Sequence, residues 1–239
     1  MQQQQTFEPS FATLPRALSF KDVVRSDTIP RGHLAAAQAW FEKNPRPELE
    51  EIPKLVSPEQ WLLTPLIGMS SLHEVLEQNK RASGQPILSR PSFDRFSSEP
   101  FYKENKKGCS WVLLRTTWVQ NTHEKDLASM EQLVAELPGE ARLLTVKEFV
   151  QFALTIHKIF RFTIFPNQSV RTSDKVQKSG IPIDVRIPQN LATGNISLFA
   201  WPFVPGQGPQ SKLPTNAGVK STAIGTTAII PLPIPEKKD

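Results

Sequence analysis

The chain has 239 residues, of which 38% are hydrophobic and 22 are proline, and it carries a formal net charge of +5. This length supports one hydrophobic core with extensions, and because Cys109 is the only cysteine, an intrachain disulfide framework is excluded. There is no bilayer-length apolar run and no basic start followed by an apolar segment, so we expect a cytoplasmic protein without a membrane partner.

Residues 1–52 are predicted to form an N-terminal arm with a flexible start. The arm opens with a glutamine run that has no hydrophobic periodicity. Residues 19–24 favour a short helix. Residues 33–43 place leucine, alanine, tryptophan and phenylalanine on one helical face, which predicts an amphipathic helix. The pattern leaves open whether this arm packs on its own domain or on a partner.

Residues 53–230 are predicted to form the main domain, followed by a proline-rich and charged tail at residues 231–239. Ser-Pro-Glu-Gln at residues 57–60 is typical of a helix start, but residues 61–64 equally fit a buried extended run. That choice stays open. A serine cap followed by inward-facing apolar residues predicts a helix at residues 72–80.

The middle of the chain alternates between irregular and regular segments. Residues 81–105 are rich in serine, proline and charge, which predicts a long loop anchored by four aromatic residues. Those anchors are Phe93, Phe96, Phe101 and Tyr102. Residues 111–119 form a β-branched and aromatic run that predicts a central strand. Leucine, methionine and valine at helical spacing predict a helix at residues 126–137.

The longest apolar periodicity in the sequence lies within residues 142–162. Thr145 is a favourable N-cap, and Glu148 three residues later completes a capping box. The apolar residues that follow at three- and four-residue spacing predict a core helix, and phenylalanine off this stripe indicates that more than one side is covered. We expect this helix to pack against the helix at residues 126–137, because consecutive elements are usually neighbours.

The last part of the chain changes to period-two patterning. Residues 181–187 and 195–201 alternate in this way and predict two strands of a hairpin. Residues 202–216 are rich in glycine, proline and glutamine and predict a loop, and residues 217–224 favour a closing strand. The order of helices and strands predicts an α+β domain.

One segment carries a family resemblance. RLLTVKEFVQFA at residues 142–153 resembles the RLPTEAEWEYA signature of the formylglycine-generating-enzyme-like branch of the C-type-lectin fold, with Leu144 in place of the family's proline. VRTSD at residues 170–174 resembles a strand entry of that branch, with Thr172 in place of cysteine. Residues 110–225 are also similar in layout to a group of uncharacterised bacterial proteins. The resemblance implies a loop-rich C-type-lectin-like domain with two packed helices and a small mixed or antiparallel sheet.

Catalytic and metal signatures are weak. The oxidase activity of that branch needs cysteines near the end of the domain, and this chain has none there. An alternative is a thiol-dependent enzyme centred on Cys109 with His157 as its base, although His157 lies on the apolar face of its helix, where a satisfied core or boundary histidine is the default interpretation. His73 has Glu77 where a zinc-protease helix has its second histidine. Phe-Pro-Asn at residues 165–167 lacks the acidic cluster that calcium requires. We therefore expect no cofactor and no metal.

A nucleic-acid accessory role is a further alternative. Residues 150–239 carry ten Lys or Arg against four acidic residues, which would favour an acidic partner. The predicted contact set combines cations for phosphates with phenylalanines for stacking. Its members are Lys158, Arg161, Arg171, Lys175, Lys178, Arg186, Phe160, Phe162 and Phe165.

The favoured function is a non-catalytic binding or complex-forming module that contacts a protein partner through its C-terminal loops or its N-terminal arm. The resemblance implies that the last strands and loops display the contact residues, and function generally sits on supported loops. The candidate residues are Asn195, Phe199, Trp201, Phe203, Gln207, Gln210, Lys212 and Asn216. Trp201 is the preferred anchor among them, and a core position for Trp201 is the alternative.

Overall fold

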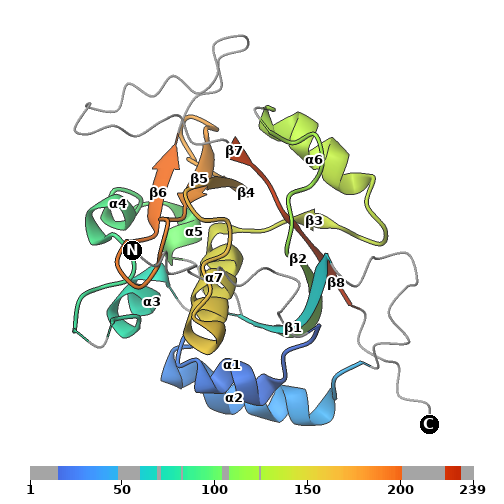
Figure 1. The fold of residues 1–239 in the computed structure, drawn as a ribbon, viewed down its shortest axis with the longest axis vertical. Coiled ribbons are helices and arrows are strands. Elements are labelled where there is room, and N and C mark those ends of the chain that lie inside the picture. Colours follow the sequence, from blue (N-terminus) through green and yellow to red (C-terminus); the bar gives the residue numbers. More distant parts are fainter. Residues whose placement is uncertain are drawn as a thin grey trace, which may run out of the picture.

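The α+β class is confirmed in a computed structural model of the chain, in which helices surround two small sheets (Figure 1). The structure describes residues 16–47, 60–68, 71–81, 83–103, 108–123, 125–200 and 224–232. One hydrophobic core runs through the described part of the chain, from Leu18 in the arm to Ile230 near its end.

The first sheet has the strand order β1-β2-β8-β3, and all its pairs are antiparallel. Its strands are β1 (Trp61–Ile67), β2 (Cys109–Arg115), β8 (Ala228–Pro231) and β3 (Arg142–Leu143). The central position predicted for the strand near residue 111 is confirmed, because β2 lies between β1 and β8. Of the helix start and the buried extended run considered for the segment after residue 57, the structure shows the extended run. It forms β1, which pairs with β2 along its whole length, and six of its seven residues are buried.

The second sheet has the order β6-β5-β4-β7. Its strands are β4 (Ser169–Lys175), β5 (Pro182–Arg186), β6 (Ser197–Ala200) and β7 (Ile224–Gly225). The predicted hairpin is confirmed, since β5 and β6 pair antiparallel. The predicted closing strand at residues 217–224 lies outside the described residues except for Ile224, which begins β7. The prediction of a single sheet is wrong, because the strands form two sheets. β7 pairs with β4 in the second sheet, whereas β8 pairs with β2 and β3 in the first. The sequence patterns did not predict β8.

Helix α7 (Val146–Phe160) is the central element between these sheets (Figure 1). Its predicted capping box is present: the Glu148 amide donates to Thr145 Oγ1 at 3.3 Å, and the Thr145 amide donates to Glu148 Oε2 at 2.8 Å. Every residue from 146 to 157 is buried, so the helix is covered on all sides over this length. It contacts β4, β5 and α1 (Phe20–Arg25).

The sequence predicts that α7 packs against the helix that precedes it, but neither helix makes its main contacts with the other. The preceding helix, α6 (Leu127–Ala135), begins at the N-cap Asp126 and makes its main contacts with β3. The physical reason is that the chain between the two helices forms β3, which pairs with β8 in the first sheet, and α6 lies against this strand. The two packed helices implied by the resemblance are corrected accordingly.

The predicted loop at residues 81–105 contains two short helices, α4 (Arg90–Asp94) and α5 (Pro100–Lys103). Proline in the first turn suits both helices, since the missing N–H would have no intrahelical partner there. The four aromatic anchors are buried as predicted. α4 packs on β6, and α5 packs on α3 (Leu72–Gln78), the helix predicted at residues 72–80.

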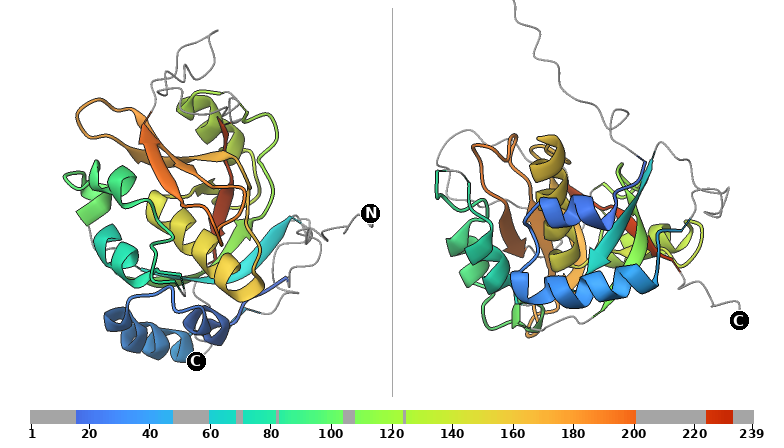
Figure 2. Two further views of the ribbon diagram at one scale, coloured as in Figure 1. Left: turned by 60° about the vertical axis from the view of Figure 1, so that its left-hand side comes forward. Right: turned by 90° about the horizontal axis from the view of Figure 1, so that it is seen from below.

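The described part of the arm packs on its own domain. α1 and α2 (Arg31–Lys43) lie side by side across one end of the molecule (Figure 2). Two backbone hydrogen bonds join the arm to β1. The Leu18 amide donates to the Leu63 carbonyl at 2.8 Å, and the Leu63 amide donates to the Arg16 carbonyl at 2.9 Å. The ring of Phe41 meets Trp111 of β2 edge-on at a centroid distance of 5.2 Å. The arm therefore completes the core of the domain.

Candidate functional site

Two of the eight predicted binding residues fall within the described structure. Asn195 is exposed just before β6, and its Oδ1 accepts a hydrogen bond from Arg81 Nη2 at 2.9 Å. Phe199 is half-buried in β6, in register with Asp184 of β5. The other six lie outside the described residues: Trp201, Phe203, Gln207, Gln210, Lys212 and Asn216. The C-terminal contact surface therefore stays a prediction.

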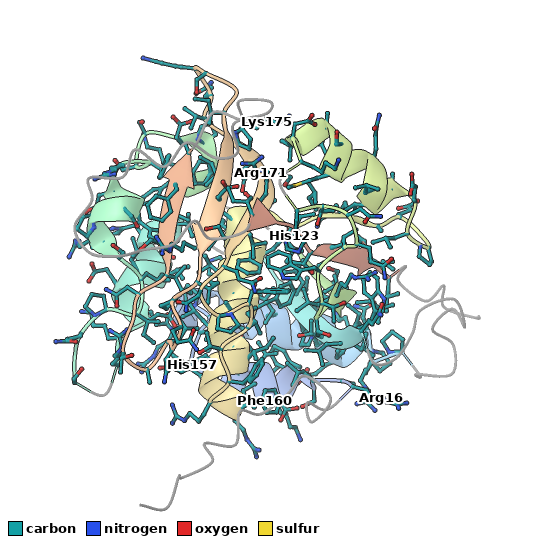
Figure 3. The ribbon with its side chains drawn as sticks, turned by 45° about the horizontal axis from the view of Figure 1, so that its top comes forward. Arg16, His123, His157, Phe160, Arg171 and Lys175 are labelled. Carbon is teal, nitrogen blue, oxygen red and sulfur yellow. The ribbon has the colours of Figure 1, made fainter. Side chains whose placement is uncertain are left out.

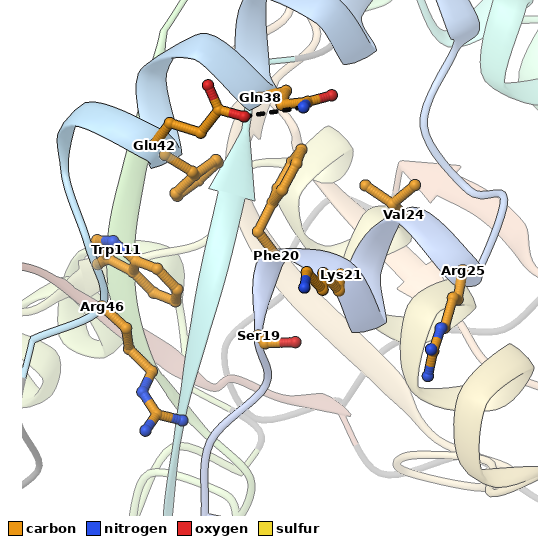
Figure 4. Close-up of a pocket in the computed structure, with 10 residues that line it drawn as sticks. Ser19, Phe20, Lys21, Val24, Arg25, Gln38, Glu42, Arg46 and Trp111 are labelled. Atoms are coloured by element: carbon orange, nitrogen blue, oxygen red, sulfur yellow. Dashed lines mark hydrogen bonds between the residues drawn. The ribbon is translucent and has the colours of Figure 1, made fainter.

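The arm forms a groove between α1 and α2 that opens to solvent, with a volume of about 690 Å³ (Figure 4). We call it the arm groove. Most of its surface is apolar. It is lined by Ser19, Phe20, Lys21, Val24, Arg25, Gln38, Phe41, Glu42, Arg46 and Trp111. The sequence patterns pointed first to the C-terminal loops, and they did not indicate that these residues form a site.

The floor of the arm groove is held in place by aromatic contacts. Phe20 points from α1 toward α2 and stacks on Phe41 at a centroid distance of 5.0 Å (Figure 4). Phe41 in turn contacts Trp111, whose indole Nε1 donates to the Asn44 carbonyl at 3.0 Å. Val24 at the edge is 36% exposed and is the only exposed large hydrophobic residue within the described ranges. The groove is thus preformed, because its apolar floor is tied to the central strand β2.

The start of α1 is also fixed. The Asp22 amide donates to Ser19 Oγ at 3.2 Å, and the Ser19 amide donates to Asp22 Oδ2 at 2.8 Å, which completes a capping box. The helix has only six residues and has little stability of its own. This cap and the packing of Val23, which is 1% exposed, therefore hold the groove wall in position.

The rim of the arm groove is cationic. Lys21, Arg25 and Arg46 line it, whereas Glu42 is the one acid among its described lining residues. The Glu42 carboxylate accepts a hydrogen bond from Gln38 Nε2 at 2.8 Å. Across residues 16–47 the chain carries six Lys or Arg and three acidic residues, a difference of +3. An apolar floor beside several cations fits a partner that combines apolar and acidic side chains.

A second, smaller cleft of about 260 Å³ lies at the start of α7, and we call it the α7 cleft. It is lined by Leu66, Ile67, Gly68, Gly108, Cys109, Ser110, Arg142, Lys147, Glu148 and Gln151. The Arg142 guanidinium donates to both Glu148 carboxylate oxygens, at 2.9 and 2.7 Å. These hydrogen bonds raise the pKa of Arg142, so its guanidinium stays charged.

Cys109 lies in the wall of this cleft at the start of β2 and is half-buried. Burial raises the pKa of its thiol, which keeps the sulfur protonated near neutral pH and makes it a poor nucleophile. The predicted partner His157 follows Gln151 by six residues, or about 9 Å along the helix axis. His157 is not among the lining residues of the cleft. The structure therefore does not bring the predicted catalytic pair together.

The predicted nucleic-acid surface is divided. Arg171 is 2% exposed and forms a buried ion pair with Asp184, so it is not available to a phosphate. Phe165 is buried against Trp118, at a centroid distance of 4.4 Å. In Figure 3, Lys175 and Phe160 lie toward opposite ends of the molecule. The remaining cations therefore do not form one stripe with the phenylalanines.

Within the described ranges, no group of three or more His, Cys, Asp and Glu residues is placed to hold a metal ion. In the same part of the chain, no helix combines the length and apolar character needed to cross a bilayer. Comparison with known proteins gives no match to any family model, curated protein or solved structure.

Proposed function

We propose that the protein is a non-catalytic binding module and that the arm groove captures an acidic amphipathic segment of a partner protein. The observation that carries this proposal is the combination of a fixed apolar floor with a rim of Lys21, Arg25 and Arg46. Of the two contact regions expected from the sequence, the N-terminal arm thus becomes the preferred one. For the scaffold we retain the C-type-lectin-like type as part of the proposal, supported by the capped helix α7 and the late hairpin of β5 and β6.

The dimensions of the groove suit a short helix or an extended segment that inserts a few side chains. Its volume of about 690 Å³ lies within the usual range for ligand sites. Two inserted leucines would contribute roughly 3–6 kcal/mol through burial, from which the cost of ordering the segment is subtracted. The cations would raise the association rate of an acidic segment and oppose a basic one.

The two alternative functions have less structural support. A thiol-dependent enzyme would need an activated sulfur, and burial raises the pKa of the Cys109 thiol instead. A nucleic-acid accessory protein would need a continuous basic surface, and Arg171 is committed to a buried ion pair.

A peptide-binding experiment on the full chain tests the proposal. Two fluorescent peptides of equal length, one alternating Glu with Leu on a helical repeat and the other replacing each Glu by Lys, are compared by anisotropy at two salt concentrations. The Glu peptide should bind and weaken as salt increases, and the Lys peptide should not bind. Equal binding of both peptides, or no binding of either, would overturn the proposal.

Variants locate the contact. Arg25→Glu reverses a charge on the rim, and Val24→Asp places a charge on an edge residue that is already 36% exposed. Both variants should weaken binding of the Glu peptide about tenfold or more. Arg31→Glu is the matched control, because Arg31 is exposed on α2 and does not line the groove. An equal loss in the control contradicts the assignment. If the unliganded chain is dimeric and Val24→Asp makes it monomeric, the occupant is a second copy and the partner proposal fails.

A further inference from the structure

Arg115, the last residue of β2, is a buried cation without a counter-charge. It is 6% exposed, and no hydrogen bond or ion pair of the described part of the chain involves its guanidinium group. The other buried arginine of these ranges, Arg171, is paired with Asp184. Charged side chains are almost never buried unless they are paired, because removing them from water is costly. Arg115 therefore lacks the anion that its burial calls for.

The charge of Arg115 cannot be removed by deprotonation. Burial lowers the pKa of Arg115, and no carboxylate of the described residues opposes this shift. A buried lysine or aspartate can lose its charge in such a place, whereas a guanidinium stays protonated in proteins. The end of β2 thus carries a permanent positive charge that an external anion can neutralise.

The guanidinium group is held in position and is open at its tip. Arg115 faces Trp61 in the strand register, and its guanidinium carbon lies 5.7 Å from the centroid of the Trp61 ring. The backbone is fixed as well, because Thr227 Oγ1 donates to the Arg115 carbonyl at 2.6 Å and the Thr116 amide donates to the Gln60 carbonyl at 2.7 Å. The Nε atom is enclosed, whereas the two Nη atoms keep access to solvent. An oxyanion can therefore reach both Nη atoms from outside and accept a hydrogen bond from each.

We infer that Arg115 and Trp61 form an anion-binding site, in which the Arg115 guanidinium binds the carboxylate or phosphate group of a small ligand while the Trp61 ring holds the guanidinium in place. Both anions match the planar fork of an arginine, which binds them through two parallel hydrogen bonds.

This anion site is separate from the arm groove. Arg115 and Trp111 lie on the same face of β2, but four residues separate them, or about 13 Å along the strand. Arg115 is also not among the described lining residues of the groove. The inference therefore does not depend on the function proposed for the groove.

The test uses the full chain with four probes at constant ionic strength: inorganic phosphate, benzoate, benzamide and benzylammonium. Binding is measured by isothermal titration calorimetry, and independently by the rise in melting temperature that a ligand of the folded state produces. Phosphate or benzoate should bind and raise the melting temperature. Benzamide, the neutral counterpart of benzoate, should bind about tenfold or more weakly than the anion, and benzylammonium should not bind.

The comparison of the two anions identifies the source of the charge. Binding of benzoate alone indicates a carboxylate ligand, and binding of phosphate alone indicates a phosphate ligand. Binding of both supports a site that recognises either group. If neither binds at millimolar concentration, water or an acidic side chain of the chain itself compensates Arg115, and the inference is wrong. Equal affinity for benzoate and benzamide would also overturn it.

Two substitutions complete the test. Arg115→Met keeps an unbranched side chain without the charge, so it should abolish both the binding of the anion and the anion-dependent rise in melting temperature. Arg115→Lys keeps a cation but loses the planar fork, so it should weaken binding about tenfold or more. Arg95→Met is the matched control, because Arg95 is exposed at the end of α4, and its affinity for the anion should not change.

The melting temperature of each variant without added anion shows first whether it folds. If Arg115→Met does not fold, Arg115→Lys and the probe series with the unmodified chain still decide the outcome. Unchanged affinity in a folded Arg115 variant, or an equal loss in Arg95→Met, would refute the assignment.

Discussion

The ion pair between β4 and β5 leads to the sharpest stability prediction. Arg171 and Asp184 face each other in the strand register and are joined by two hydrogen bonds, Nε to Oδ1 at 2.9 Å and Nη2 to Oδ2 at 3.1 Å. Their side chains are 2% and 1% exposed. Arg171 Nη1 also donates to the Lys125 carbonyl at 3.2 Å. Asp184→Asn would therefore leave a guanidinium buried without its counter-charge.

Breaking a buried pair in this way costs about 3–5 kcal/mol, because the remaining charge stays desolvated. Whole domains have unfolding free energies of roughly 5–15 kcal/mol, so the variant would lose about a fifth or more of its stability. For a chain of this size, the melting temperature should fall by roughly 6–20 °C. Arg171→Met combined with Asp184→Leu removes both charges, and this double variant should recover most of the loss.

Urea unfolding followed by tryptophan fluorescence and by circular dichroism measures both quantities, and the double-mutant cycle isolates the coupling between the two residues. Burial raises the pKa of Asp184, and the hydrogen bonds from Arg171 oppose this rise. A loss under about 1 kcal/mol for Asp184→Asn would show that the carboxyl group is already neutral in the folded protein, and the argument from an unpaired charge would be refuted.

Two further predictions concern α7. Thr145→Ala removes the side-chain oxygen that accepts from the Glu148 amide, so the unfolding free energy should fall by about 1 kcal/mol in urea titrations, whereas Ala at the exposed Thr193 should change it by less than half as much. The pKa of His157 is lowered by burial first and then by Arg161, so the folded protein binds fewer protons than the unfolded chain below about pH 6.5. Stability should therefore fall as the pH decreases through that value, by up to about 1.4 kcal/mol per pH unit, and His157→Gln should reduce this slope. An identical pH dependence in His157→Gln would contradict the second prediction.

The elements that could be predicted from the sequence are those whose signals are local. The capping box of Thr145 and Glu148 and the periodicity after it define α7 within one segment, and the alternation at residues 181–187 similarly predicts β5. β8 was missed because Ala-Ile-Ile-Pro is too short to show alternation. Its status as a strand depends on pairing with β2, more than a hundred residues earlier in the chain. The short helices α4 and α5 were hidden by a composition typical of loops.

The candidate sites were harder to predict, because each one combines distant segments. The arm groove needs Phe20, Phe41 and Trp111 to meet, and the sequence assigned the last two to separate hydrophobic faces.

The short link between β7 and β8 has a consequence for how the chain reaches its folded state. Only Thr226 and Thr227 separate these strands, and their hydroxyls donate to the carbonyls of Arg171 in the second sheet and Arg115 in the first. Because β8 lies between β2 and β3, the first sheet has an unfilled central position until residues 228–231 emerge from the ribosome. During synthesis the nascent protein therefore exposes two unpaired strand edges, and it should need chaperone protection until β8 inserts between β2 and β3.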